Sequence, residues 1–374
     1  MKAFAALAVT LSAVTALLTA LLTACSTVPS STVPSSTVVT SATPNSPRVG
    51  SAPQAGSTPR AASARVFGRI FHDPAATVTG GRLYVTWQVN SPTAAVPQFE
   101  LVRVNQVTGA IAAVHLLAPG QVGAPLVAGG SLWVPVARAA GESLLRLNPQ
   151  GLAETGNVAV SGGSDESMGR GSHLAVAGDA LWVAGGDRLL RVSLVTGQVI
   201  ASIPLPGAAT SGVAANGTGT TMVVSEANDS GVGSVQRRDP VTGALLASHP
   251  MLGVAASALD GIIDSGVWLS EPTGLLGYVE RFRTATMAPD PATDVGGDNG
   301  INAVVADGVV WITDPAAPDR DYCADPVTGR VLARVRLPDP RQDDLVAVSR
   351  QYLYYDSPAS SGFYLSRVPV PGAC

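Results

Sequence analysis

The sequence is poor in charged residues and nearly lacks lysine. Only 13% of its 374 residues are Asp, Glu, Lys or Arg, and Lys2 is the single lysine. The formal net charge of −4 at pH 7 excludes a nucleic-acid binder of the usual basic kind. Long amphipathic helices need charged exposed faces and little Gly or Pro, whereas this chain has 40 Gly and 28 Pro. An all-helical bundle is therefore excluded as well.

Histidine and cysteine are also scarce, with four and three residues. The sequence has no Cys or His cluster at the spacing of metal ligands and no Gly-x-Ser-x-Gly motif. It also lacks a glycine-rich phosphate loop with a lysine. These absences remove the commonest signatures of zinc sites, serine hydrolases and nucleotide-binding enzymes.

The first 25 residues predict export and lipidation. Lys2 precedes an uncharged apolar stretch over 4–22. The residues Leu22-Thr23-Ala24-Cys25 then match the bacterial lipobox, in which a peptidase cuts before a cysteine that becomes lipidated. We predict a lipoprotein signal peptide over 1–24 and a palmitate-type lipid on Cys25. An ordinary secretory signal and a single membrane helix are the alternatives.

The segment 25–64 predicts a disordered tether. Its first pentapeptide, Ser26-Thr27-Val28-Pro29-Ser30, is repeated at 31–35, and the segment has no apolar periodicity and no carboxylate. Such a tract cannot bury enough surface to offset its ordering entropy. The rest of the chain is therefore expected on the extracytoplasmic face of the bacterial cell membrane, held there by the lipid.

From residue 65 onward the chain repeats itself. An apolar triplet with a central aromatic recurs seven times, and its centres lie 41 to 49 residues apart. Six of the seven centres are aromatic, and four of the five tryptophans occupy this position. The centres are Tyr84, Trp133, Trp182, Val223, Trp268, Trp311 and Tyr354.

Each triplet is followed by a β-prone run, a tight turn and a further β-prone run. The turn reads Asp-Pro-Val-Thr-Gly at 239–243 and again at 325–329. Asp caps such a turn, Pro presets φ, and Gly accepts a positive φ. Four short strands in about 45 residues correspond to one blade of a β-propeller. We predict an all-β, seven-bladed β-propeller of twenty-eight strands over 65–374, monomeric, with each central aromatic packed between adjacent blades.

The seventh unit lacks a fourth strand, and two cysteines remain unassigned. The segment 65–70 resembles the other fourth strands, so we predict that this N-terminal strand completes blade seven and closes the ring. A disulfide between Cys323 and Cys374 would pin the end of the chain to blade six. Two free thiols are the alternative, because strand positions alone do not establish the distance between the sulfurs.

The strand pattern resembles the YVTN-type β-propeller repeat. Tyr84-Val85-Thr86 matches the first three letters of that name, and 192–205 resembles the second half of the repeat. The resemblance implies the fold but no activity, because its members range from surface proteins to periplasmic binding proteins.

Two enzymatic propeller families show a more distant likeness. Quinoproteins share the Asp-x-x-Thr-Gly turn but place a docking tryptophan four residues after its glycine. Here that position holds Ala113, Ala201, Ala247 and Ala333, so no quinone cofactor is expected.

The segment 267–271 looks like a strand ending of the streptogramin lyases, whose catalysis uses histidines near a Mg²⁺ site. This chain has no such histidine pair, and its four histidines are His72, His115, His173 and His249.

Carboxylates gather at one position of the repeat. Three residues after the triplet centre, where the strand is expected to reach the loop face, blades four to six place an acid. Neighbouring loops would add further oxygen ligands, which suit Ca²⁺ better than a transition metal. The alternative interpretation is a set of solvated strand ends. The candidate residues are Glu226, Glu271, Asp314, Asp298, Asn299, Asp343 and Asp344.

These features favour a membrane-anchored, extracytoplasmic binding or interaction propeller without catalysis. Its partner would be an extracellular protein or a cell-wall component. One alternative is a lyase or hydrolase that uses the acidic position. Another is a cell-wall structural protein, in which the tether matters more than the propeller.

Overall fold

The structure, a computed structural model, describes residues 67–70, 74–90, 96–138, 141–160, 173–185, 187–206, 208, 210–228, 230, 232–252, 259–263, 265–271, 278–290, 295–296, 302–313, 321–335, 344–359 and 362–374. The chain divides into two compact units, Met1–Thr58 and Pro59–Cys374, and all described residues belong to the second. The predicted signal peptide, Cys25 and the tether lie outside them. Among the described residues, no helix is long and apolar enough to cross a membrane.

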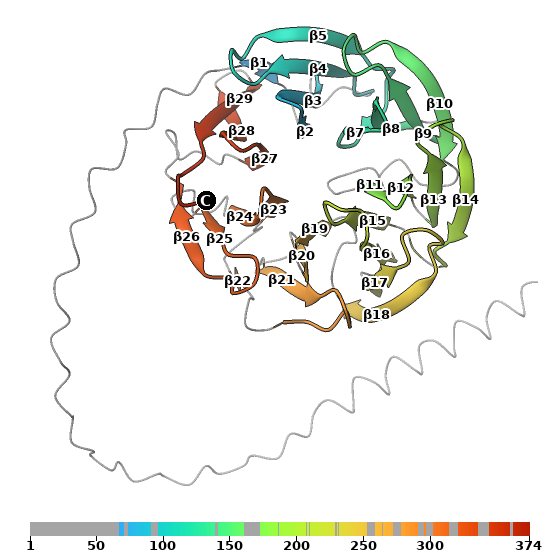
Figure 1. Ribbon diagram of the computed structural model, residues 1–374. Coiled ribbons are helices and arrows are strands. Elements are labelled where there is room, and N and C mark those ends of the chain that lie inside the picture. The colour runs from blue at the N-terminus through green and yellow to red at the C-terminus, as the bar shows by residue number, and fades with distance from the viewer. Residues whose placement is uncertain are drawn as a thin grey trace, which may run out of the picture. The chain divides into compact units, whose positions relative to one another are not determined.

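Seven antiparallel sheets, here called blades 1 to 7, form a ring in the second unit (Figure 1). Blade 1 consists of β2 (Ala75–Thr79), β3 (Arg82–Gln88), β4 (Phe99–Asn105) and β5 (Ile111–Leu116). Blade 2 consists of β6 (Gln121–Val122), β7 (Leu126–Ala128), β8 (Ser131–Arg138), β9 (Gly141–Leu147) and β10 (Glu154–Val160). Blade 3 consists of β11 (Leu174–Ala177), β12 (Ala180–Gly185), β13 (Arg188–Ser193) and β14 (Val199–Pro204).

The remaining blades follow the same order from the centre outward. Blade 4 consists of β15 (Thr210–Ala215), β16 (Met222–Ala227), β17 (Val232–Arg238) and β18 (Leu245–Leu252). Blade 5 consists of β19 (Leu259–Ile263), β20 (Gly266–Glu271), β21 (Tyr278–Arg283) and β22 (Val295–Gly296). Blade 6 consists of β23 (Asn302–Ala306), β24 (Val309–Thr313), β25 (Tyr322–Ala324) and β26 (Val331–Arg334). Blade 7 consists of β27 (Asp344–Val348), β28 (Tyr352–Ala359), β29 (Gly362–Pro369) and β1 (Phe67–Ile70).

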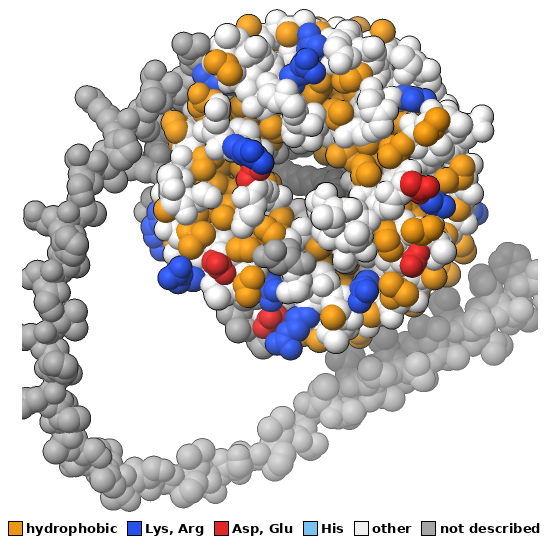
Figure 2. Space-filling view, viewed as in Figure 1, with side chains coloured by type: hydrophobic (Ala, Val, Ile, Leu, Met, Phe, Trp, Pro, Cys, Tyr) orange, Lys and Arg blue, Asp and Glu red, His pale blue; other side chains and the backbone are white. Residues whose placement is uncertain are grey.

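This architecture confirms the predicted all-β, seven-bladed propeller. The first strand of each blade surrounds the centre of the ring in Figure 1, and Figure 2 shows the opening there. The described residues form 29 strands rather than twenty-eight, because the inner strand of blade 2 is divided into β6 and β7, which both pair with β8. Pro125 lies between the two pieces and has no N–H to donate to the ladder.

The ring is closed by its N-terminal strand, as predicted. Strand β1 pairs antiparallel with β29, with Phe67 opposite Leu365 and Ile70 opposite Phe363. Blade 7 therefore combines three strands from the end of the described chain with one from its beginning. Closure in this way gives blade 7 its outer strand, and only short, protected strand edges remain in the ring.

The seven triplet centres are buried, each with an exposed fraction of at most 2%. Each one packs against the blade that follows it. Tyr84 of blade 1 shares a cluster with Leu132 and Val134 of blade 2. Tyr354 of blade 7 shares one with Leu83 and Val85 of blade 1, which completes the circle. The aromatic side chains therefore bind neighbouring blades to each other, as the repeat predicts.

The tight turns seat these aromatic side chains. Asp239 accepts hydrogen bonds on Oδ1 from the backbone N–H groups of Val241 at 2.9 Å and Thr242 at 2.7 Å. Gly243 has a φ of 73°, and a Cβ there would lie 2.9 Å from the Trp182 ring. The indole Nε1 of Trp182 donates to the Pro240 carbonyl at 3.1 Å. The turn of blade 4 thus holds the tryptophan of blade 3.

An arginine faces the triplet centre in six of the seven blades. The strand registers pair Tyr84 with Arg103, Trp133 with Arg146, Trp182 with Arg191, Val223 with Arg237, Trp268 with Arg281, and Tyr354 with Arg367. Three of these arginines reach a turn carbonyl of the next blade. Arg146 Nη1 lies 3.5 Å from Val195 O, Arg237 Nη1 lies 3.4 Å from Ala285 O, and Arg367 donates to Gln106 O and, at 3.1 Å, to Val107 O.

Blade 6 has Cys323 in the place of this arginine, opposite Trp311. Cys323 and Cys374 form a disulfide, with their Cα atoms 6.2 Å apart. Cys374 follows β29 and packs with Trp311 and Tyr355 in the cluster between blades 6 and 7. Because β1 supplies the fourth strand of blade 7, that blade offers no turn carbonyl here. A covalent bond therefore joins blades 6 and 7 where other neighbours use a hydrogen bond.

Removal of this disulfide is expected to destabilise the ring. The double variant Cys323→Ser, Cys374→Ser should lose about 2–4 kcal/mol of unfolding free energy, because its unfolded chain is no longer cross-linked. Guanidinium denaturation of both proteins, with and without dithiothreitol, measures this difference. Dithiothreitol should lower the denaturation midpoint of the wild type and leave that of the double variant unchanged. A wild-type midpoint that does not change with dithiothreitol would contradict the disulfide.

Candidate functional site

The structure describes part of the predicted acidic site. Glu226 lies in β16 and is half-buried. Glu271 ends β20, with its backbone opposite Tyr278, and Asp344 begins β27, with its backbone opposite Asp356. The other candidates lie outside the described residues, and they are Asp314, Asp298, Asn299 and Asp343.

The position three residues after the triplet centre points between blades. Trp87 is 4% exposed and packs with Tyr354 of blade 7, and Val136 is fully buried with Tyr84 of blade 1. Side chains alternate along a strand, so this position shares a face with the residue just after the centre and points to the preceding blade. Strands β12 and β20 end at this position, whereas β3 and β8 continue past it, and the side chains of Trp87 and Val136 lie in the seams between blades and not on an open loop face.

Glu226 belongs to a polar ladder along blade 4. Its Oε1 accepts hydrogen bonds from Ser234 Oγ at 3.0 Å and Gln236 Nε2 at 2.6 Å. Gln236 Oε1 accepts from Arg238 Nε at 2.9 Å and Nη2 at 2.6 Å, and Arg238 Nη1 donates to Gly243 O at 2.9 Å. Burial lowers the pKa of Arg238, and the charge of Glu226 opposes that shift. The side-chain amide of Gln236 therefore links the buried guanidinium of Arg238 to the carboxylate of Glu226, which compensates its charge.

The second oxygen of this carboxylate makes no hydrogen bond to the described residues. Glu226 Oε2 is buried and has no hydrogen-bond partner among the described residues. Ser211, directly opposite on β15, is 1% exposed, and its Oγ has no partner there either. Within the described ranges, no three His, Cys, Asp or Glu side chains are grouped so that they could hold a metal ion. Calcium binding at the acidic position stays a prediction.

Asp260 is a half-buried acid that the sequence reasoning missed. It lies on the inner strand β19, where the register with β20 shifts between Leu259 and Gly261. Its Oδ1 accepts a hydrogen bond from Ser270 Oγ at 3.0 Å, and its Oδ2 is buried without a partner in the described part of the chain. Burial raises the pKa of Asp260 well above its usual range, against the opposing effect of the Ser270 hydrogen bonds. The sequence feature that could have identified Asp260 is an acidic residue within an otherwise apolar strand.

The described histidines lie on three different blades. His173 precedes β11 and is 2% exposed, and its backbone oxygen accepts from Ala184 N at 2.9 Å. His115 and His249 lie on the outer strands β5 and β18, as the repeat predicts. His72 lies outside the described residues.

The seven sheets define the fold class, a seven-bladed β-propeller, and solved structures resemble the chain over most of its length. A chain of the mitotic checkpoint complex matches with a TM-score of 0.57 and 13% identity, over 90% of this chain and 99% of that chain. BamB from Moraxella catarrhalis matches with a TM-score of 0.47 and 15% identity, over 82% and 100%. The computationally designed Ika8 protein matches with a TM-score of 0.49 and 11% identity, over 83% and 98%.

These identities concern the fold alone. No protein-family model matches the sequence, and no curated protein matches it. The particular function must therefore be argued from the residues of this chain.

The raised pKa of Asp260 predicts a pH dependence of stability. In the unfolded chain its pKa is near 3.8 and in the fold it is higher, so its contribution is largest below the unfolded value and is lost as pH rises toward the folded one. Asp260→Asn keeps an oxygen acceptor for Ser270 and does not titrate. Its melting temperature relative to wild type should therefore rise as the pH increases above about 3.8.

Asp239→Asn is a control for which the melting temperature relative to wild type is expected to change with pH in the opposite direction. Hydrogen bonds from Thr242 lower the pKa of Asp239, so the melting temperature of that variant should fall relative to wild type as pH rises toward about 3.8 and should change little above that pH. If the melting temperatures of wild type and Asp260→Asn change with pH in the same way, the fold does not raise the pKa of Asp260.

Proposed function

We propose that the propeller is a non-catalytic binding module that docks a protein partner outside the cytoplasmic membrane, where a lipid on Cys25 holds it. The observation that carries this proposal is a set of exposed valines on the turns between the third and fourth strands. Their exposed fractions are 68% for Val107, 84% for Val195, 51% for Val241 and 51% for Val327. We call these four residues the turn valines.

The hydrogen bonds that close these turns do not involve the side chains of the turn valines. The caps and the glycine close each turn, as Asn105 does by accepting from Val107 N at 2.9 Å and Thr108 N at 3.0 Å. Equivalent turns of the seven blades project from the same face of a propeller. Apolar side chains repeated on one face favour association with a partner. Figure 2 also shows hydrophobic side chains around the ring on the face in view, with charged groups scattered among them.

The turns are rigid, which favours docking over loose contact. Backbone N–H groups of Thr242 and Thr328 hold the pKa values of Asp239 and Asp325 below the usual range, so both caps are firmly ionised. Arg146 and Arg367 fix the turns of blades 3 and 1 from the preceding blades. A preformed surface loses little conformational entropy on binding. The presence of this fold in the mitotic checkpoint complex agrees with such a role, at the level of the fold alone.

Photo-crosslinking from the turns tests the docking face. A benzophenone amino acid at Val195 or Val241, in the full-length protein in its own membranes, is expected to give one discrete protein adduct. Ile200 on the outer strand of blade 3 is the matched control, with 52% of its surface exposed. Equal adducts from Ile200, or none from either turn position, would contradict the docking face. An adduct that wall-degrading enzymes dissolve would favour the cell-wall alternative.

Lipidation has a separate test. Metabolic labelling with palmitate should mark the wild type, and Cys25→Ser should lose the label, because the thiol that carries the lipid is absent. The variant should also leave the detergent phase in a detergent-partition experiment. Ser26→Ala is the control that should keep both properties. A label that persists in Cys25→Ser would contradict the anchor.

Asp260 favours a second candidate function, a propeller enzyme. A carboxyl whose pKa is raised by burial, beside a serine hydroxyl on the inner strand of blade 5, is a group suited to acid–base chemistry. Mass spectrometry of small molecules released when the purified protein is denatured tests this function. A released compound that is lost in Asp260→Asn would favour the enzyme over the binding module.

A further inference from the structure

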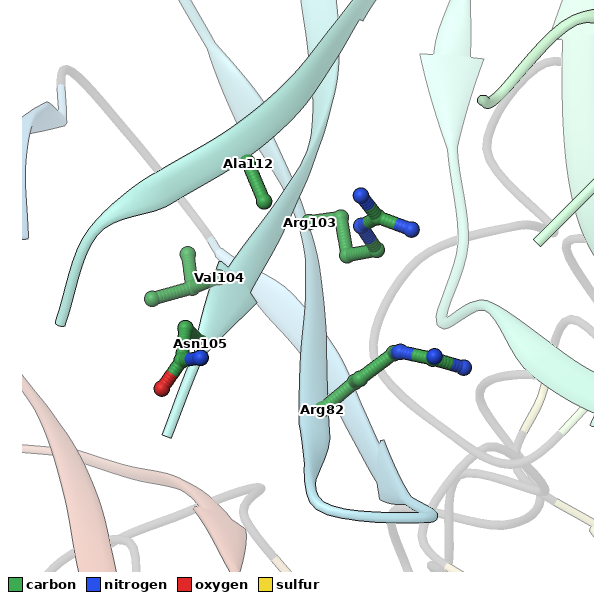
Figure 3. A pocket seen from close by; sticks show the side chains of 5 residues that line it. All are labelled: Arg82, Arg103, Val104, Asn105 and Ala112. Carbon is green, nitrogen blue, oxygen red and sulfur yellow. The ribbon is translucent and has the colours of Figure 1, made fainter. Parts of the chain in front are cut away.

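Two arginines of blade 1 share one face of the sheet. Arg82 begins β3 opposite Asn105, and Arg103 lies on β4 opposite Tyr84. They are therefore diagonal neighbours on adjacent strands, a relation that sets Cβ atoms roughly 7–8 Å apart. In Figure 3 both side chains extend to the same side of the blade.

The equivalent arginine has a partner within its own blade in four other blades. Arg146 Nε donates to Ser131 Oγ at 2.9 Å, and Arg191 forms an ion pair with Asp179. Arg281 contacts Asp290 at 2.6 Å and Ser265 Oγ at 3.3 Å, and the Arg367 guanidinium lies 4.2 Å from the centre of the Tyr352 ring. Ser131 and Tyr352 stand two residues before the triplet centre, and Asp179 and Ser265 stand three before it.

Blade 1 departs from this arrangement by placing a cation where the partner would be. Arg82 stands two residues before Tyr84, the position of Ser131 and Tyr352 in their blades. The guanidinium groups of Arg82 and Arg103 have no hydrogen-bond or ion-pair partner among the described residues. The Pro149 carbonyl in the next turn accepts instead from Tyr84 Oη at 3.0 Å. Arg103 thus keeps the residue type of the repeat and loses its structural role.

The two arginines line a recess of about 140 Å³, together with Val104, Asn105 and Ala112. Two like charges on one face repel each other unless an anion lies between them. Each guanidinium presents a planar fork of N–H donors that matches two oxygens of a phosphate or carboxylate. Two forks offer more donors and more charge than one carboxylate uses, whereas a tetrahedral dianion satisfies both.

We propose that Arg82 and Arg103 form a binding site for a dianionic oxyanion of the phosphate type, either free or as the monoester group of a ligand. The site lies on the side of blade 1 that faces blade 2 and does not depend on the turn valines or on the acidic position. It adds to the proposed docking function a ligand of defined charge.

Isothermal titration of the purified full-length protein with inorganic phosphate at low ionic strength tests the site. The wild type should bind one equivalent, and Arg82→Gln and Arg103→Gln should each weaken binding by about tenfold or more, since each loses one charged fork. Arg350→Gln is the matched control, because its side chain is 90% exposed and lies 3.6 Å from Asp307. Arg103→Lys keeps the charge but lacks the fork, so its affinity should fall between wild type and Arg103→Gln.

Several outcomes would overturn the proposal. They are a wild type that does not bind phosphate, an equal loss in Arg350→Gln, and unchanged binding in both glutamine variants with intact thermal melts. Glycerophosphoglycerol, the soluble headgroup of an anionic lipid, carries one charge and should bind more weakly than phosphate. Tighter binding of this diester than of phosphate would contradict the proposed preference for a dianion and would indicate that the recess binds a membrane lipid.

Discussion

The packing between neighbouring blades is the interaction on which the whole ring depends. Each triplet centre buries its side chain against the following blade, so no blade is stable without its neighbours. In a closed ring the last blade must also pack against the first. That contact therefore joins segments that lie far apart in the sequence. Strand β1 and the Cys323–Cys374 disulfide both act around blade 7, where this closure occurs.

The same constraint explains where polar groups are tolerated. A charge in a seam between blades is desolvated, so it needs a compensating partner or must be neutral. Arg238 has Glu226, reached through Gln236, whereas Asp260 has a serine hydroxyl and a raised pKa. The two polar groups are therefore compensated differently, Arg238 by a carboxylate reached through an amide and Asp260 by a hydroxyl and a raised pKa. Net charge summed from the sequence misses that difference.

The fold was predictable because its signals are local. The spacing of triplet centres and the turn residues at 239–243 depend only on neighbours in the sequence, and the missing fourth strand pointed to β1. The candidate site was less predictable, because side-chain direction and burial depend on register and on the adjacent blade. Trp87 and Val136 are buried in seams that no single blade reveals, and Asp260 lies half-buried at a register shift beside Gly261. The sequence shows that Asp260 is the one acid in its strand, but it does not show that the fold raises the pKa of this residue.

Repetition makes departures from the pattern informative. The position opposite the triplet centre is occupied by arginine in six blades and by cysteine in the blade before the closure. Cys323 shows that the position changes its residue type when the neighbouring turn is absent. Arg103 shows the reverse, since its residue type is kept while Tyr84 has taken the turn carbonyl and Arg82 has replaced the partner. A serine in place of Arg82 would offer Arg103 the partner that Ser131 offers Arg146, so the packing of the ring does not account for the second cation. The oxyanion that we propose would lie between the two guanidinium groups and balance their charge.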